Sequence, residues 1–173
     1  MNNIKTEMEL TAKYMTELVY PQIQKLGWIK GELYSIENNP DDTLKMLDTR
    51  SAIDGFILES NGSIPISTRC QYGTSYSTFT IRRSLRSGKK TEYDKVSYAI
   101  NHPGYTYPHF YIHAYLTSKY NGKLISMGMA RTKDIYPLIS EDNINSAPDG
   151  NTFYFVRWDA LTANGKKCRT KIF

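Results

Sequence analysis

The sequence is short of several features that would assign it to a particular protein class. It has two cysteines, Cys70 and Cys168, and their wide separation gives no metal-binding pair. The longest apolar stretches, such as residues 53–58, are interrupted and have only strand length, so no membrane span is expected. The first residues lack the basic and then apolar pattern of a secretion signal. We therefore expect unpaired thiols and a cytoplasmic protein that does not contact membranes.

Familiar catalytic motifs are missing as well. The chain carries no Walker loop, dinucleotide fingerprint, zinc ribbon or Ser–His–Asp spacing. His109 and His113 would share one face of a strand, but a zinc site needs further ligands. Only His102 and the two distant cysteines could supply them. We interpret His109 and His113 as polar strand positions beside tyrosines.

Positive charge and tyrosine are what the sequence has in excess. The formal net charge is +5 with 14 tyrosines, and the sequence pI is about 9.1. Tyrosine can donate to phosphate oxygens and stack on unpaired bases, so this composition favours a nucleic-acid partner. The alternative is a strand-rich protein with tyrosine on half-buried faces. The residues predicted to contact the nucleic-acid backbone are Arg82, Arg83, Arg86, Lys89 and Lys90.

The hydrophobic pattern predicts a single domain, residues 1–173, that mixes helices and strands. Helices are expected at residues 6–26, 91–100 and 132–139. Strands are expected at 28–36, 52–59, 64–71, 78–85, 109–116, 123–130 and 152–158, followed by a basic tail. Asn61-Gly62 is typical of a tight turn, so the early strands should be antiparallel. A strand after the helix at 91–100 could run parallel to one of them, which gives an α/β (α+β) fold with a central mixed sheet.

A candidate site lies on the two strands around the Asn61-Gly62 turn. Asp54 stands near the start of the first strand. On the second, Ser67, Arg69 and Gln71 share one face because strand side chains alternate. An acidic residue opposite such a polar triplet can hold a metal ion and a phosphodiester.

This arrangement resembles the core of the PD-(D/E)xK, or restriction-endonuclease-like, nuclease superfamily. The resemblance covers residues 6–116: a long first helix, a strand with an aspartate, a hairpin, a strand with a spaced polar pair, and a helix after the third core strand. Residues 117–173 would be a C-terminal extension. In that family the aspartate and the (D/E) residue bind magnesium, and the lysine orients the attacking water.

The resemblance assigns roles to particular residues. Asp54 matches the aspartate, and Ser67-Thr68-Arg69 matches the (D/E)-x-K element. Ser67 therefore replaces a carboxylate, and Arg69 replaces lysine, keeping the charge with a different shape. Because magnesium prefers anionic oxygen ligands, further carboxylates are needed, and Glu7 or Glu92 are the expected sources.

Three functional hypotheses follow. The first is a magnesium-dependent DNA endonuclease, with manganese as a substitute, in which Asp54, Ser67, Arg69 and Gln71 form the catalytic site. The second is a catalytically inactive DNA- or RNA-binding protein on the same scaffold. The third is a protein-interaction module that antagonises a host factor through its basic face. An enzyme that cuts both strands commonly uses two active sites, which is compatible with a homodimer, although no residue demonstrates one.

Overall fold

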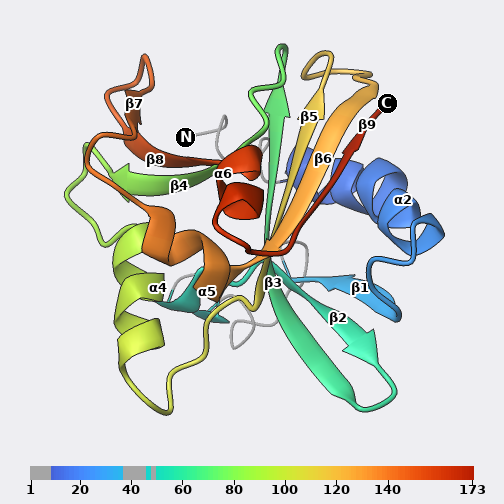
Figure 1. Ribbon diagram of the computed structural model, residues 1–173, viewed down its shortest axis with the longest axis horizontal. Coiled ribbons are helices and arrows are strands. Elements are labelled where there is room, and N and C mark those ends of the chain that lie inside the picture. The colour runs from blue at the N-terminus through green and yellow to red at the C-terminus, as the bar shows by residue number, and fades with distance from the viewer. Residues whose placement is uncertain (1–8, 37–45, 48–49) are drawn as a thin grey trace.

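The computed structural model describes residues 9–36, 46–47 and 50–173 (Figure 1). Within these residues the strands form one six-stranded sheet and one three-stranded sheet. The large sheet contains, in spatial order, β1 (Glu32–Ser35), β2 (Gly55–Glu59), β3 (Gly62–Tyr72), β5 (Phe110–Leu116), β6 (Leu124–Arg131) and β9 (Cys168–Ile172). The small sheet contains β4 (Thr78–Ser84), β8 (Thr152–Arg157) and β7 (Ile144–Ser146).

The large sheet is mixed, as the sequence predicts. Strands β1, β2 and β3 form an antiparallel meander, and β3 pairs in parallel with β5. The segment between β3 and β5 contains β4 and the helix α4 (Glu92–Asn101), which supplies the long connection that parallel strands need. The remaining pairs, β5–β6 and β6–β9, are antiparallel. The α+β class and the parallel strand after the helix are thereby confirmed.

Two predictions about strands are wrong. The strand predicted at 78–85 does not join the central sheet, because β4 pairs with β8 in the small sheet. The strand predicted at 152–158 is confirmed as β8 to within one residue, and the helix α6 (Trp158–Ala163), which was not predicted, follows it. The basic tail contains β9, which pairs with β6 and forms one edge of the large sheet.

The N-terminal helical segment covers one face of the large sheet (Figure 1). It is helical from residue 9 to residue 25 and includes the π-helical turn η1 (Met15–Val19) and α2 (Tyr20–Lys25). Pro21 follows the π-helical turn and lies in the first turn of α2, where its missing N–H removes no regular α-helical hydrogen bond. The core on this face includes Met15, Val19, Ile23, Ile57, Ile66, Ile112, Leu116, Met127 and Met129.

The opposite face packs against the small sheet and the short helices. Its core includes Phe79, Ile81, Tyr111, Tyr115, Ala130, Ile135, Val156, Trp158 and Leu161. Ile135 belongs to α5 (Thr132–Ile135), which continues into the 3-10 helix η2 (Tyr136–Leu138). Gly128 lets Trp158 pack closely, since a Cβ there would lie 2.5 Å from the indole ring. No helix in the described part of the chain is both long and apolar enough to cross a membrane.

Candidate functional site

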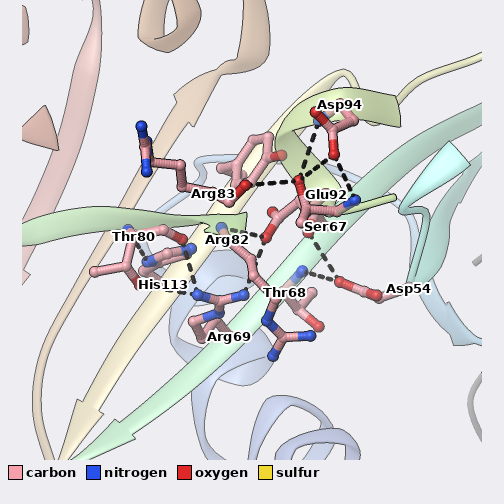
Figure 2. A network of polar contacts seen from close by, with 12 residues as sticks. Asp54, Ser67, Thr68, Arg69, Thr80, Arg82, Arg83, Glu92, Asp94 and His113 are labelled. Carbon is pink, nitrogen blue, oxygen red and sulfur yellow. Dashed lines mark hydrogen bonds and ion pairs between the residues drawn. The ribbon is translucent and has the colours of Figure 1, made fainter. Parts of the chain in front are cut away.

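Asp54 and Ser67 are in direct contact at the start of β2 (Figure 2). The hydroxyl of Ser67 donates to Oδ2 of Asp54 at 2.9 Å, and the backbone N–H of Thr68 donates to the same oxygen at 2.6 Å. Ser67 is 6 % exposed, so this contact is shielded from bulk water. The alternation predicted for β3 holds: Ile66 and Cys70 join the core beneath the N-terminal helix, whereas Ser67 and Arg69 face the other side.

Arg69 joins this face of β3 to α4. Its Nη2 donates to Oε2 of Glu92 at 3.0 Å, and its Nη1 donates to the carbonyl and the hydroxyl of Thr80 at 3.1 and 3.2 Å. The side chains of Arg69 and Glu92 are 21 % and 12 % exposed. Removing one partner of such a shielded pair would leave the other charge without compensation. Glu92, one of two predicted additional carboxylates, therefore reaches the site.

The start of α4 fixes the position of Glu92. Thr91 caps the helix by accepting from the backbone N–H of Asp94, and Oδ2 of Asp94 accepts from the backbone N–H of Thr91 at 2.8 Å. This reciprocal capping box satisfies backbone donors that the first turn leaves without helical partners. Glu92 lies in that first turn, where the positive end of the helix favours a carboxylate.

Arg82 brings a second guanidinium to the site. Its backbone N–H donates to Oε2 of Glu92 at 3.2 Å, and its guanidinium lies 5.8 Å from the ring centre of Phe153. Arg69 lies 5.4 Å from the same ring. Burial, followed by the positive charge of Arg69, lowers the pKa of Arg82, and Nε of Arg82 has no hydrogen-bond partner among the described residues. The guanidiniums of Arg69 and Arg82 therefore lie near the same ring and concentrate positive charge beside Glu92.

Tyr111 and His113 on β5 complete the buried side of the site. Tyr111 pairs with Ser67, and His113 pairs with Arg69, in the parallel ladder. Burial and the charge of Glu92 raise the pKa of Tyr111 well above 10. Burial and the charge of Arg69 lower the pKa of His113 well below 6.5, so the imidazole is neutral and its Nδ1 accepts from the backbone N–H of Thr80 at 3.2 Å.

Sequence reasoning did not include Tyr111 and His113 in the site. Their positions follow from the register between β3 and β5, which a short pattern of alternation does not contain. The only available signal was that both residues share one face of a predicted strand.

The other predicted site residues lie elsewhere. Gln71 is one strand repeat beyond Arg69, and its buried Oε1 has no hydrogen-bond partner among the described residues. Arg83 is engaged on the small sheet, where Nη2 donates to Oε2 of Glu141 at 2.9 Å and Nε donates to the hydroxyl of Tyr154 at 3.1 Å. Glu7 lies outside the described residues. The remaining predicted contacts, Arg86, Lys89 and Lys90, are exposed between β4 and α4.

The carboxylates of the site could hold magnesium only together with waters and a substrate phosphate. Among the described residues, no group of three or more His, Cys, Asp and Glu side chains could hold a metal ion. Glu92 already accepts from Arg69 and Arg82, and Asp54 accepts from Ser67 and Thr68. Magnesium usually keeps several waters and is held by one or two carboxylates together with substrate phosphates. The donor set is compatible with that mode and not with an all-protein cage.

Two comparisons with known proteins assign no family or function to this chain. No protein-family model matches the chain, and the search of curated proteins found no similar sequence. The polar groups gathered on this face are two carboxylates, two guanidiniums, a serine hydroxyl and the buried hydroxyl of Tyr111, which contacts the hydroxyl of Tyr136 at 3.0 Å. They come from β3, β4, β5, α4 and the residue before β2.

Proposed function

We propose that the protein binds nucleic acid at this site and hydrolyses phosphodiester bonds of DNA with the help of Mg²⁺ or Mn²⁺, as a divergent restriction-endonuclease-like enzyme. The observation that carries the proposal is the presence of two polar pairs, Asp54 with Ser67 and Arg69 with Glu92, on the same face of β3. The order of helix, β1–β2–β3 meander, α4 and parallel β5 supports the likeness to that nuclease core.

Each residue has a role in this proposal. Asp54 would hold the metal jointly with a phosphate oxygen, and the metal would stabilise negative charge on the phosphate and activate water. Arg69 and Arg82 would bind the phosphate, because guanidinium groups match phosphate geometry. Glu92 orients the guanidinium of Arg69 through Oε2 and accepts from the backbone N–H of Arg82. The exposed Arg86, Lys89 and Lys90 would contact the backbone on either side.

A second candidate function is binding without cleavage. Ser67 stands where a carboxylate is expected and donates to Asp54, so one oxygen of the Asp54 carboxylate is already engaged. Glu92 is neutralised by Arg69. A protein of this kind would keep the basic surface and bind DNA or RNA with a strong dependence on salt.

Cellular location and assembly are part of the proposal. Cys168 is a free thiol whose pKa is raised to about 12 by burial. A thiol retained in this form fits the reducing cytoplasm. A homodimer would place two such sites on the two strands of a duplex.

Incubation of the purified protein with supercoiled plasmid at low salt tests the proposed activity. Mg²⁺, Mn²⁺ and a chelator are compared in parallel reactions. We expect nicking that requires the metal and is unchanged by Asp159→Asn, which alters an exposed carboxylate paired with Arg157. Binding without nicking under either metal would support the second candidate. Absence of both binding and nicking would exclude both candidates and leave the protein-interaction module.

A further inference from the structure

Exposed aromatic rings gather where α4 ends and the chain turns back toward β5. The ring of Tyr98 stacks on the imidazole of His102, with the ring centres 3.8 Å apart and the planes 13° apart. Tyr105 meets the ring of Tyr98 edge to face at 5.0 Å. Tyr98 and Tyr105 are 46 % and 58 % exposed, and His102 is exposed as well. These three side chains form the ring cluster, and Figure 1 shows the end of α4 and the following loop at the periphery of the molecule.

The local backbone holds the ring cluster in place. In the turn His102-Pro103-Gly104-Tyr105, the backbone N–H of Tyr105 donates to the carbonyl of His102 at 3.4 Å. Proline at the second position and glycine with a φ of 89° at the third are favoured by a type II turn. Nδ1 of His102 donates to the carbonyl of Tyr98 at 2.7 Å. The rings are therefore positioned before a ligand arrives, which lowers the entropic cost of binding.

The segment that carries the ring cluster is basic. Nζ of Lys90 lies 6.0 Å from the centre of the Tyr98 ring. Residues 95–133 include no Asp or Glu. The acidic residues that precede this segment, Glu92 and Asp94, are already engaged at the start of α4. This charge distribution favours an anionic partner.

The rings and the charge together match an unpaired nucleotide. Exposed aromatic side chains beside basic ones are typical of surfaces that bind single-stranded nucleic acid. Tyr98 and His102 are already parallel, so a base can extend this stack from the exposed imidazole. The bases of an intact duplex cannot do so, because neighbouring pairs cover their faces. A membrane surface is a poorer match, since interfacial segments expose Trp, Phe or Leu, and the exposed residues 101–106 include none of these.

The ring cluster is separate from the candidate site. Glu92, Val96 and Ala99 share one side of α4 by their spacing, and the burial of Val96 and Ala99 turns this side toward the interior. Tyr98 lies on another side and about 9 Å further along the helix axis than Glu92. Lys90 connects the two regions, because it precedes the helix and still reaches the ring of Tyr98.

We propose that the ring cluster and Lys90 form a binding surface for unpaired nucleotides on the outer side of α4. This inference rests on the proposed function and specifies its substrate as nucleic acid with a single-stranded segment. The rings stack on the bases, and Lys90 binds a phosphate of the same strand. Contact at this surface requires neither the metal nor the carboxylate of Asp54, so it can be measured apart from cleavage.

Dissociation constants for a single-stranded oligonucleotide and for the blunt duplex formed from it, measured by fluorescence anisotropy in chelator, test this surface. Tyr105→Ala should bind the single strand about tenfold more weakly, equivalent to about 1.4 kcal/mol, because it loses stacking on one base. Its affinity for the duplex should stay close to that of the wild-type protein. Tyr105→Phe retains the ring and should keep the affinity for the single strand. The matched control is Tyr120→Ala, because Tyr120 is 65 % exposed and follows β5 at the opposite end from the ring cluster.

Several results would overturn the surface. One is an unchanged affinity of Tyr105→Ala for the single strand, and another is an equal loss in Tyr120→Ala. A third is sedimentation with anionic phospholipid vesicles that Tyr105→Ala abolishes while single-strand affinity is unchanged. If the protein still nicks plasmid in these cases, only the ring cluster fails. If the wild-type protein binds neither the single strand nor the duplex, the proposed function fails with it.

Discussion

The two faces of the large sheet differ in what they bury. The face beneath the N-terminal helical segment is filled with aliphatic and methionine side chains such as Ile23, Ile66 and Met127. The opposite face combines an aromatic core with a polar network around Arg69 and Glu92. A single strand, β3, supplies both faces through its alternating side chains. The difference indicates that the first face stabilises the fold and the second positions chemical groups.

The polar face is compatible with a folded core because the groups at its centre are hydrogen-bonded; the buried Nε of Arg82 and Oε1 of Gln71 are exceptions among the described residues. Ser67 donates to Asp54, and Arg69 donates to Thr80 and Glu92. Leaving a buried donor or acceptor without a partner costs about 1–3 kcal/mol, which explains why the network is so connected. Substitutions on the two faces should therefore have separable effects on stability and on function.

The largest effect on stability is expected on the apolar face. Ile23→Ala removes a side chain that is 1 % exposed and leaves a cavity, so the free energy of unfolding should fall by about 2–5 kcal/mol. Urea denaturation measures this loss. The control Leu26→Ala, at a position that is 39 % exposed, should cost much less. Equal costs at the two positions would contradict the assignment of this face to stability.

A smaller loss of stability is expected from a substitution on the polar face. Glu92→Gln keeps the size of the side chain but removes the charge that Arg69 contacts, so unfolding should become easier by about 1–3 kcal/mol. Nucleic-acid binding should change in the same variant, because the guanidinium of Arg69 loses the negative charge that holds it in place. Glu141→Gln is the control, since it alters an exposed pair with Arg83. Identical behaviour of the two variants would show that the network has no special role.

The neutral imidazole of His113 predicts a dependence on pH. Its pKa is lowered in the folded state, so below about pH 6.5 the unfolded chain binds a proton that the folded protein does not. The contribution of the neutral His113 to stability is therefore fully present above about pH 6.5. As the pH decreases, the free energy of unfolding should fall by up to about 1.4 kcal/mol per pH unit, until the pKa of His113 in the folded protein is reached.

Denaturation of His113→Asn over the same pH range measures this contribution, because Asn does not titrate and retains an acceptor for Thr80. The free energy of unfolding of this variant should fall less steeply with decreasing pH than that of the wild-type protein. The control His102→Gln, at an exposed position, should keep the wild-type slope. A wild-type slope in His113→Asn would mean that His113 is not the group responsible.

The smallest effect is expected at the exposed loop between β4 and α4. Lys89→Ala/Lys90→Ala should reduce the slope of log affinity against log salt by about 2, because each phosphate contact contributes about 0.9. Titrations at several salt concentrations give this slope. An unchanged slope would place the nucleic-acid backbone elsewhere on the molecule.

The sequence predicted local features better than long-range pairing. Alternation along β3 placed Ser67 and Arg69 on one face, and the Asn61-Gly62 turn placed Asp54 beside them. Alternation along residues 78–85 predicts a strand but not the sheet to which it belongs, so β4 was assigned to the central sheet instead of the small one. Strand β9 was missed because its residues read as a charged tail, and only pairing with β6 makes it a strand.

Only the local part of the candidate site could be predicted from the sequence. The pair of Asp54 and Ser67 lies within one hairpin, whereas the contact between Arg69 and Glu92 depends on how α4 crosses over the sheet. Glu92 was a candidate on chemical grounds alone. His113 and Phe153 come from strands whose register is set by the whole fold, and no local pattern indicates them.

The most direct test of the polar face is to compare Asp54→Ala and Asp54→Asn with the wild-type protein in plasmid nicking and in DNA binding. Asparagine keeps an acceptor for the backbone N–H of Thr68, which guards against loss of folding. We predict that both variants lose metal-dependent nicking while binding in chelator stays within a few-fold of wild type. Nicking at the wild-type rate by the folded Asp54→Asn variant would contradict the assignment of this carboxylate and with it the proposed active site.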